Sequence, residues 1–476
     1  MFLRLDDQGP LHGQLTRALK AAILEGRLRT GERLPSSRSL AAELRLSRNT
    51  VLASYEELEA EGFLLGKTGS GSYVAAVEPR IPPPPLEAAP ARLSAFALRS
   101  LEAHRGRMPG GEHRGLRYNL QYGLPLVNPA LTSAWRRELA RAAAYAPMDY
   151  PNAQGLPALR EAVCGYLMRR RGLQASPDDV LIVSGTQEAF ALSAQVLLDP
   201  GEHVAIEDPH YRAASRIFQA HGLHVDGVPV DDEGLVCDAL PQQPVARMVC
   251  VTPSHQFPLG VVMSLPRRLA LLRHAQVHDA WILEDDYDGE FRYGGAPLAA
   301  LRSLDAHDRT LYVGTFSKTL FPSLRLGYMV LPRALMRAFR TAKWLADAGC
   351  AAIEQLALAH FIDSGGFERH LRRAAKTLRA RRTALVQGLR EHGGERVEVL
   401  DSHAGMHLVA WLRGFDAAAC EVLVERARAV GLGLYPIAPY YLRAPERQAL
   451  LLGYGGLGVG EIREATRLLG SCLAMG

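Results

Sequence analysis

The chain has 476 residues, of which 48% are hydrophobic and 22% are charged, and its formal net charge is +5. This length exceeds what one ordinary hydrophobic core organises, so we expect two or three globular units. No apolar run reaches the roughly 18 residues that a membrane span needs, and the early charges at the start are unlike a signal peptide. The six cysteines are scattered without a C-x-x-C pair, which argues against disulfides and a zinc site. The sequence therefore predicts a cytoplasmic protein without membrane contact.

Residues 1–77 carry the pattern of three helices followed by a hairpin. Apolar residues at helical spacing predict a helix that Gly26 ends. Ser36 and Ser47 are suited to cap a second and a third helix, and Gly62 ends the third. A Gly-rich tip between short β-type runs predicts a β-hairpin over 63–75. Together these elements predict a winged helix-turn-helix, with a plain three-helix packing module as the alternative.

The charge of this domain indicates one possible partner. Between residues 17 and 48 there are eight basic residues against three acidic ones. In a winged helix-turn-helix the start of the third helix enters the major groove of double-stranded DNA, while the second helix and the wing meet phosphates. The predicted DNA contacts are Ser36, Arg38, Arg48, Asn49, Thr50, Lys67 and Thr68.

Several short motifs in this domain make a family resemblance specific. In order and spacing, L-P-S-S-R at 34–38, L-S-R-N-T-V at 46–51, Y-E-E-L at 55–58, E-G at 61–62 and G-S-G at 69–71 resemble the DNA-binding domain of GntR-type bacterial regulators. The resemblance covers roughly residues 8–77 and implies operator binding.

Residues 78–117 are predicted to be a linker. Four consecutive prolines and neighbouring Pro79 and Pro90 exclude a helix interior there and favour extended polyproline geometry. The Arg- and Gly-rich continuation shows no strong periodicity. We expect a partly disordered tether long enough for the head of one chain to reach the body of another.

From residue 118 to 476 the pattern alternates between helices and short apolar strands. Strands are predicted near 180–184, 204–207, 248–252, 281–285 and 311–314. This alternation predicts an α/β fold with a mostly parallel central sheet, a large lobe over about 145–335 and a smaller C-terminal α+β lobe over about 336–476. Ligands are expected at the carboxyl edge of such a sheet.

The stretch T-F-S-K-T-L-F at 315–321 presents one lysine in unusual surroundings. Lys318 follows an apolar strand and is framed by Phe316 and Phe321. Burial lowers the pKa of an amine and makes it nucleophilic, which is the condition for a Schiff base with an aldehyde. A surface lysine at a strand end is the alternative.

Three further strand ends carry candidate ligands for a flat, phosphorylated ring. The turn 184–187, S-G-T-Q, is suited to phosphate at a helix start, or to plain helix capping. Tyr211 could stack on a ring or simply pack. In E-D-D-Y at 284–287, two adjacent aspartates would repel each other and lose hydration if both were buried, so at least one is expected to have a cationic partner. An exposed acidic loop is the alternative, and no histidine near this stretch in sequence supports a metal site.

Taken in order, these pieces resemble the fold type I aminotransferases that use pyridoxal phosphate, over about residues 118–476. The resemblance implies that Lys318 forms the Schiff base and that Asp285 pairs with the pyridine nitrogen. It further implies that Tyr287 bonds the ring hydroxyl oxygen and that Tyr211 stacks on the ring. The implied phosphate ligands are Thr186, Gln187, Thr315, Ser317 and Arg325.

Two departures separate the chain from that family. Phe257 stands in the place of an asparagine that bonds the ring hydroxyl, and the stretch L-L-L-G-Y-G-G at 450–456 lacks the arginine that grips a substrate carboxylate. Both variants, together with the N-terminal domain, resemble the MocR subgroup of GntR regulators. The resemblance implies a homodimeric, pyridoxal phosphate-dependent transcriptional regulator, with its heads exchanged head-to-tail, that senses the cofactor or a small amine or amino acid. A working aminotransferase and a DNA-binding protein whose second domain only dimerises are the alternatives.

Overall fold

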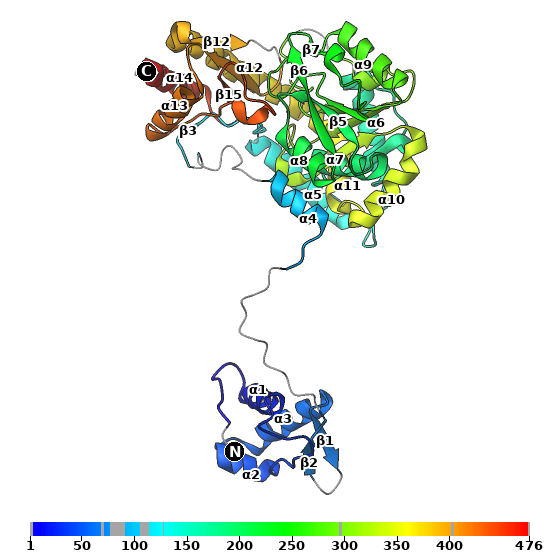
Figure 1. Cartoon of the computed structure of the whole chain (residues 1–476), viewed down its shortest axis with the longest axis vertical. Coiled ribbons are helices and arrows are strands. Elements are labelled where there is room, and N and C mark those ends of the chain that lie inside the picture. The colour runs from blue at the N-terminus through cyan, green and yellow to red at the C-terminus, as the bar shows by residue number, and fades with distance from the viewer. Residues whose placement is uncertain are drawn as a thin grey trace. The chain divides into compact units, whose positions relative to one another are not determined.

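The computed structural model describes residues 3–67, 71–76, 91–104, 113, 115–126, 128–294, 298–400 and 404–474. The chain divides into two compact units, Met1–Arg92 and Leu93–Gly476, which are drawn in Figure 1. Within the described ranges, no helix is long and apolar enough to cross a membrane.

The first unit consists of three helices and a two-stranded hairpin. Helix α1 spans Leu11–Leu24, α2 spans Ser37–Leu44 and α3 spans Arg48–Ala60. Strands β1 (Leu64–Lys67) and β2 (Gly71–Val74) pair antiparallel. The Ser36 and Ser47 side chains accept hydrogen bonds from the backbone N–H groups of Ser39 and Thr50, so both predicted helix caps are confirmed. The apolar faces of the three helices close on one core that includes Leu19, Leu40, Val51, Tyr55 and Leu58.

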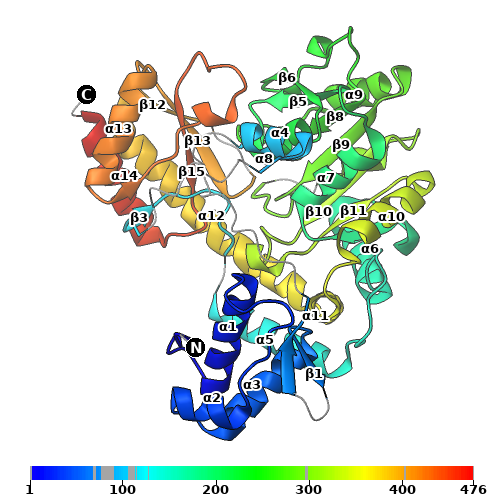
Figure 2. The ribbon, with the colours of Figure 1, turned by 60° about the horizontal axis from the view of Figure 1, so that its bottom comes forward.

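The second unit begins within the segment predicted as linker. Residues Ala95–Ala103 form helix α4, which packs against α8 (Arg212–Ala220), as Figure 2 shows. The Arg99 Nε donates to the Ala220 carbonyl at 3.0 Å, and the Phe96 ring meets His221 edge-on. The predicted linker over 78–117 therefore includes an ordered helix at 95–103, where contacts with α8 supply the stabilisation that sequence periodicity does not reveal. The proline-rich part of the predicted linker lies outside the described residues.

The large lobe is built on a mixed sheet that is mostly parallel. Eight strands of the described chain lie in the order β4-β11-β10-β9-β8-β5-β6-β7, and β11 and β7 run antiparallel to their neighbours. The predicted α/β fold is thus confirmed. The strands are β4 (Val180–Val183), β5 (His203–Asp208), β6 (His224–Asp231), β7 (Gly234–Leu235), β8 (Met248–Val251), β9 (Trp281–Asp286), β10 (Thr310–Thr315) and β11 (Gly327–Val330).

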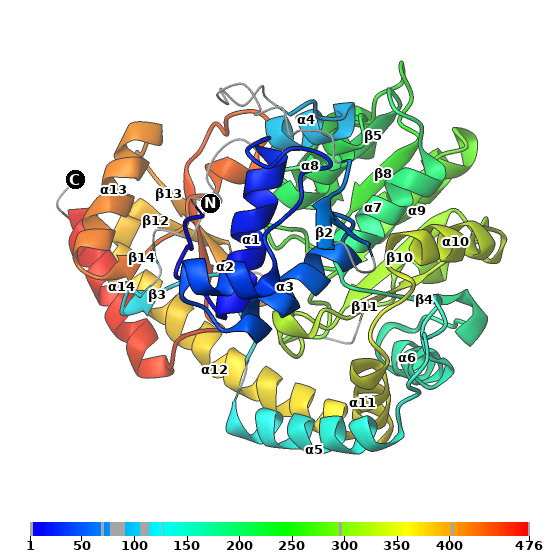
Figure 3. The same cartoon turned by 90° about the horizontal axis from the view of Figure 1, so that it is seen from below.

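Helices cover this sheet, and two of them lie beyond the boundary predicted between the large and the small lobe. Helices α10 and α11 follow residue 335, yet they contact α7 and α6 of the large lobe. The boundary predicted at 336 was therefore too early in the chain. Helix α5 packs against α11, and Figure 3 shows α11 next to one end of α5. The helices are α5 (Pro129–Tyr145), α6 (Pro157–Arg171), α7 (Thr186–Leu197), α9 (Leu265–Val277), α10 (Met336–Asp347) and α11 (Ala352–Asp363).

The small lobe has its own antiparallel sheet. Strand β13 (His407–Leu412) lies between β12 (Val397–Leu400) and β15 (Ala449–Gly453). Strand β3 (Tyr118–Asn119), early in the second unit, pairs with β14 (Leu432–Gly433) and so brings the segment after it to the small lobe. The lobe also contains helices α12 (Gly366–Gly393), α13 (Ala417–Ala429) and α14 (Val459–Ala474).

Candidate cofactor site and DNA interface

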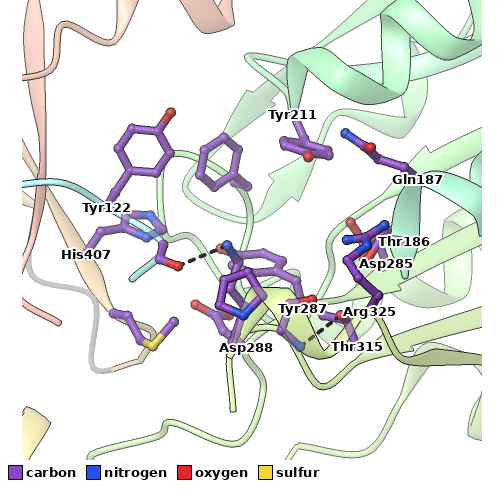
Figure 4. Close-up of a pocket in the computed structure, with 16 residues that line it drawn as sticks. Tyr122, Thr186, Gln187, Tyr211, Asp285, Tyr287, Asp288, Thr315, Arg325 and His407 are labelled. Carbon is purple, nitrogen blue, oxygen red and sulfur yellow. Dashed lines mark hydrogen bonds between the residues drawn. The ribbon is translucent and has the colours of Figure 1, made fainter. Parts of the chain in front are cut away.

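One cavity lies at the carboxyl ends of the large-lobe strands. Its volume is about 240 Å³, and we call it the Lys318 cavity. All nine side chains that the sequence predicts to bind the cofactor border it (Figure 4): Thr186, Gln187, Tyr211, Asp285, Tyr287, Thr315, Ser317, Lys318 and Arg325.

Lys318 lies in this cavity just past the end of β10. Its Nζ donates a hydrogen bond to the Gly123 carbonyl at 3.1 Å. Burial lowers the pKa of the amine, and the Asp288 and Asp285 carboxylates oppose that shift without cancelling it. A lowered pKa raises the share of neutral amine at Lys318, which is the form that a Schiff base requires.

The two adjacent aspartates at the end of β9 have different partners. Asp286 faces away from the cavity and forms an ion pair with the buried Arg171, with 2.6 Å between Oδ2 and Nε. Asp285 points into the cavity, and its buried Oδ1 has no hydrogen-bond partner within the described structure. Burial, with repulsion from Asp286, raises the pKa of Asp285 to about 8. This unpaired carboxylate fits a protonated ring nitrogen.

Asp285 needs a cationic partner, whereas the groups at the start of α7 need an anionic one. The Arg325 guanidinium lies against Gly185, where a Cβ would come within 3.3 Å of Nη1. Gly185 is the N-cap of α7, so Thr186 and Gln187 present unbonded backbone N–H groups beside this cation. Thr315 borders the same cavity, and its Oγ1 accepts a hydrogen bond from the Ser317 N–H at 3.2 Å. These groups form a cradle that fits a phosphate.

Aromatic rings line the rest of the cavity. The Phe257 ring packs against Tyr211, Tyr287 and Tyr122 at centroid distances of 6.1, 5.9 and 5.8 Å. Burial raises the pKa of the Tyr211 phenol, and a side-chain hydrogen bond with Gln187 partly offsets that shift. Phe257 offers no polar atom where aminotransferases carry asparagine, so its contribution to the cavity is the apolar wall.

Several cavity residues are missing from the sequence prediction. Tyr122 and Gly123 come from the segment after β3, and Met406 and His407 come from the small lobe. Figure 4 shows Tyr122 and His407 across the cavity from Gln187 and Arg325. These residues follow no strand of the large sheet and lie far along the chain from Lys318, so no local spacing connects them. Asp288 also borders the cavity, and its place in E-D-D-Y-D was the available signal.

No histidine stands near the acidic stretch in sequence, but the fold brings His255 to Asp288. The His255 Nδ1 lies 3.0 Å from an Asp288 oxygen, and the His255 and His407 rings are 5.1 Å apart. Possible ligand atoms of these three residues lie within 4.8 Å of one another. However, the His407 Nε2 donates to the Pro258 carbonyl at 3.0 Å, and His255 is held by Asp288, so hydrogen bonds account for this arrangement.

Tight packing at the end of β15 excludes side chains at two positions of the stretch that lacks the arginine. A Cβ at Gly453 would lie 2.1 Å from the Gln121 carbonyl oxygen, and one at Gly455 would lie 1.9 Å from that of Leu124. The segment that carries Tyr122 and Gly123 thus occupies the space that side chains at these two positions would need.

In the first unit, the predicted DNA contacts lie at two helix starts and on the hairpin. Arg48 and Asn49 are exposed in the first turn of α3, with Thr50 half-buried beside them. Arg38 is exposed in the first turn of α2, next to the cap Ser36. Arg48 Nε reaches Ser37 Oγ at 3.4 Å, which links the two helix starts. Lys67 ends β1, and Thr68 lies outside the described residues.

Both units match known families. Residues 11–74 match the family described as bacterial regulatory proteins of the gntR family, and residues 119–443 match aminotransferase class I and II. The chain is also similar over 99% of its length to the probable rhizopine catabolism regulatory protein MocR of Rhizobium meliloti, with 36% identity over 95% of that protein. The chain belongs to the MocR subgroup of the GntR family.

A second relative of this subgroup is the pyridoxine biosynthesis transcriptional regulator PdxR of Corynebacterium glutamicum. It is 30% identical over 97% of this chain and 96% of its own length. Among solved structures, the kynurenine aminotransferase of Pyrococcus horikoshii in complex with PMP covers 81% of this chain and 95% of its own. Its TM-score is 0.69 and its identity 28%. The aminotransferase match and the fit of the Lys318 cavity indicate that the second unit binds pyridoxal phosphate.

Proposed function

We propose that the protein is a DNA-binding transcriptional regulator that senses pyridoxal phosphate, or an amine or amino acid that reacts with it, through Lys318. The observation that carries this proposal is the Lys318 cavity, which places a lysine of lowered pKa with an unpaired carboxylate and a phosphate cradle in a chain that also carries a GntR-type head.

Nine of the cavity residues would hold the cofactor. Bound there, pyridoxal phosphate would supply an aldehyde for an imine with the Lys318 amine, with loss of water, and a ring that withdraws electrons. Asp285 would pair with the ring nitrogen through its orphaned Oδ1. Tyr287 would donate to the ring hydroxyl oxygen, and Tyr211 would stack on the ring. The phosphate would be bound by Thr186, Gln187, Thr315, Ser317 and Arg325.

A ligand in this cavity touches both lobes. Lys318 and Asp285 belong to the large lobe, whereas His407 starts β13 of the small lobe. A ligand that fits one arrangement of the lobes better than another therefore shifts the balance between them, with a coupling of about 1–3 kcal/mol in typical allosteric proteins.

Helix α8 offers a physical connection from the cavity to the linker. Tyr211 is the N-cap of α8, and the far end of the same helix holds α4 through Ala220 and His221. Because α4 is the first helix after the proline-rich linker, a change at Tyr211 reaches the anchor of the chain that leads to the head.

The DNA contacts proposed for the head are Arg48, Asn49 and Thr50 in the major groove. Ser36, Arg38, Lys67 and Thr68 are proposed to bind phosphates on either side. Since operator DNA is the target, the protein is proposed to act in the bacterial cytoplasm.

A homodimer is proposed from an exposed apolar surface of the second unit. Tyr145, Met148 and Tyr150 are 76%, 94% and 86% exposed, and Trp344 and Leu345 on α10 are 62% and 73% exposed. The two segments adjoin, because a Cβ at Gly349, just beyond α10, would lie 3.3 Å from the Ala153 Cα. Soluble monomers rarely expose such a patch, and a second copy would cover it.

Met148→Asp combined with Trp344→Glu should convert a dimer to a monomer in sedimentation, and an unchanged dimer would assign the interface elsewhere. The head-to-tail exchange of heads remains a prediction.

The test is a spectral titration of the protein with pyridoxal phosphate and then with a panel of amines, run beside binding to the DNA upstream of its own gene. A near-visible band that an amine alters together with DNA affinity supports sensing. A protein that stays colourless would instead be a DNA-binding module whose second domain only dimerises.

Aminotransfer is the second candidate, because the cavity retains a complete set of candidate cofactor ligands. Steady turnover of an amino donor with a keto acid acceptor would favour it. The absence of the carboxylate-binding arginine from the stretch 450–456 argues for weak turnover or none.

A further inference from the structure

A buried pair, His255 and Asp288, lies behind Tyr287. Both side chains are only 1% exposed, and the His255 Nδ1 lies 3.0 and 3.1 Å from the two Asp288 carboxylate oxygens. The same Nδ1 lies 2.9 Å from the Tyr287 hydroxyl. Tyr287, Asp288 and His407 border the Lys318 cavity (Figure 4), whereas His255 touches it only through them.

The His255 ring is fixed in place by its surroundings. Gly405 packs against its edge so closely that a Cβ there would lie 1.9 Å from Cε1. The Gly405 carbonyl is itself held by the hydroxyls of Tyr293 at 2.6 Å and Tyr454 at 2.5 Å. The ring therefore cannot swing away from Tyr287 without moving this backbone.

The chemistry of the pair fixes the direction of the hydrogen bonds. A carboxylate oxygen accepts hydrogen bonds, so the His255 Nδ1 that faces both Asp288 oxygens is assigned as the donor. Facing Tyr287, that N–H is a donor shared between the carboxylate and the phenol oxygen. The Tyr287 proton must then point elsewhere, and the open direction is the cavity. Burial raises the pKa of the Tyr287 phenol well above its ordinary value, so the hydroxyl keeps this proton.

We propose that Asp288 and His255 are positioning residues that aim the Tyr287 hydroxyl at the ring hydroxyl oxygen of pyridoxal phosphate. This inference rests on the proposed function. It gives the chain a replacement for the asparagine whose place Phe257 takes, because a hydroxyl that accepts from His255 is a stronger donor in turn. Donation to the ring oxygen would favour its ionised form. A larger share of this form is expected to raise the ratio of the near-visible to the near-ultraviolet absorbance of the bound cofactor, so the loss of the donor should lower it.

The test compares that absorbance ratio in the full-length, cofactor-loaded protein and its variants. Asp288→Asn is the sharpest change, because an amide N–H facing Nδ1 reverses the tautomer and draws the Tyr287 proton toward His255. We expect Asp288→Asn and His255→Leu to lower the ratio about fivefold, as the loss of one hydrogen bond would, and to match Tyr287→Phe. His255→Gln should restore part of the ratio, since its amide can donate.

Two controls separate positioning from general damage. Asp226→Asn removes the carboxylate from another histidine pair of the same unit, His203 and Asp226 at 2.7 Å, and should leave the ratio unchanged. Gly405→Ala keeps every polar group but displaces the His255 ring, and should shift the ratio in the same direction as Asp288→Asn. If Asp288→Asn does not fold by circular dichroism, His255→Gln and Gly405→Ala decide the question.

Three outcomes overturn the inference. Unchanged ratios in the folded variants, beside a changed ratio in Tyr287→Phe, contradict the positioning role alone. A ratio that responds to a metal chelator would assign His255, Asp288 and His407 to a cation. A wild-type chain without a near-visible band that depends on Lys318 contradicts the proposed function, and this inference falls with it.

Discussion

Two lysines of the second unit are withdrawn from bulk water, and they behave in opposite ways. Lys343 on α10 has a fully buried side chain, yet its pKa is raised, because Cys350, Asp347 and Glu188 together outweigh the cost of burial. Its Nζ lies 2.8 Å from Glu188 Oε1 and also pairs with Asp347. Lys318 forms no ion pair with any described carboxylate, and burial lowers its pKa. Burial therefore lowers the pKa of a lysine, and makes its amine reactive, only where no carboxylate pairs with it.

The largest expected effect separates these two lysines by function. Lys318→Ala should abolish the near-visible absorbance that pyridoxal phosphate gives the protein, because Lys318 is the one lysine among the described residues that line the Lys318 cavity. The measurement is an absorbance titration after dialysis, with Lys343→Met as the control that keeps the band. An unchanged spectrum in Lys318→Ala would remove this residue from the site.

The second effect is one of stability and concerns Lys343. Lys343→Met leaves Glu188 and Asp347 without their shared cation and should lower the free energy of unfolding by roughly 2 to 3 kcal/mol. This is less than a fully buried pair would lose, because Asp347 is 35% exposed. Urea unfolding of the cofactor-free protein measures it. A loss as large in Lys318→Ala would mean that Lys318 too is mainly structural.

The third effect concerns pH and the unpaired Asp285. Its pKa is about 8 in the fold against an ordinary value of 3.8, so between these values the folded state binds more protons than the unfolded state. Stability of the cofactor-free protein should therefore fall as pH rises from about 4 to about 8. Asp285→Asn should reduce the fall between pH 6 and pH 8 by about 1 to 2 kcal/mol. Urea midpoints at both pH values measure this, and an unaltered slope would place the titration on Glu207 or Glu284, whose pKa values burial raises to about 7.

The smallest expected effect is on DNA affinity, and it compares a paired with an unpaired cation in the DNA-binding unit. Arg27 is paired with Glu25 at 2.7 Å, whereas Arg48 is exposed and bonds only Ser37 Oγ within the described structure. Arg48→Ala should weaken operator binding by about 1 kcal/mol, or roughly fivefold, and reduce the salt dependence. Fluorescence anisotropy at several salt concentrations measures this. Arg27→Ala should bind like wild type, and equal losses in both variants would indicate a general charge effect.

The sequence predicts the parts of the site that follow strands. Lys318, Asp285 and Thr186 each come directly after an apolar run, and the carboxyl ends of parallel strands meet at one edge of a sheet. The helix caps Ser36 and Ser47 are equally local, since a cap is decided within four residues.

The parts that the sequence does not predict depend on long-range packing. Gly123 receives the Lys318 hydrogen bond across 195 positions, and His255 meets Asp288 across 33. No periodicity encodes such pairs. Helix α4 escaped prediction for a related reason, because it buries none of its side chains fully and is held mainly by Phe96 and Arg99 against α8.

The central claim is that a cofactor held by Lys318 changes DNA binding. Its most direct test is the affinity for operator DNA, with and without pyridoxal phosphate, of the wild type and of Lys318→Ala side by side. A change of about 5- to 150-fold in the wild type that disappears in Lys318→Ala is the predicted result. An equal change in both proteins, or none in the wild type, would contradict it.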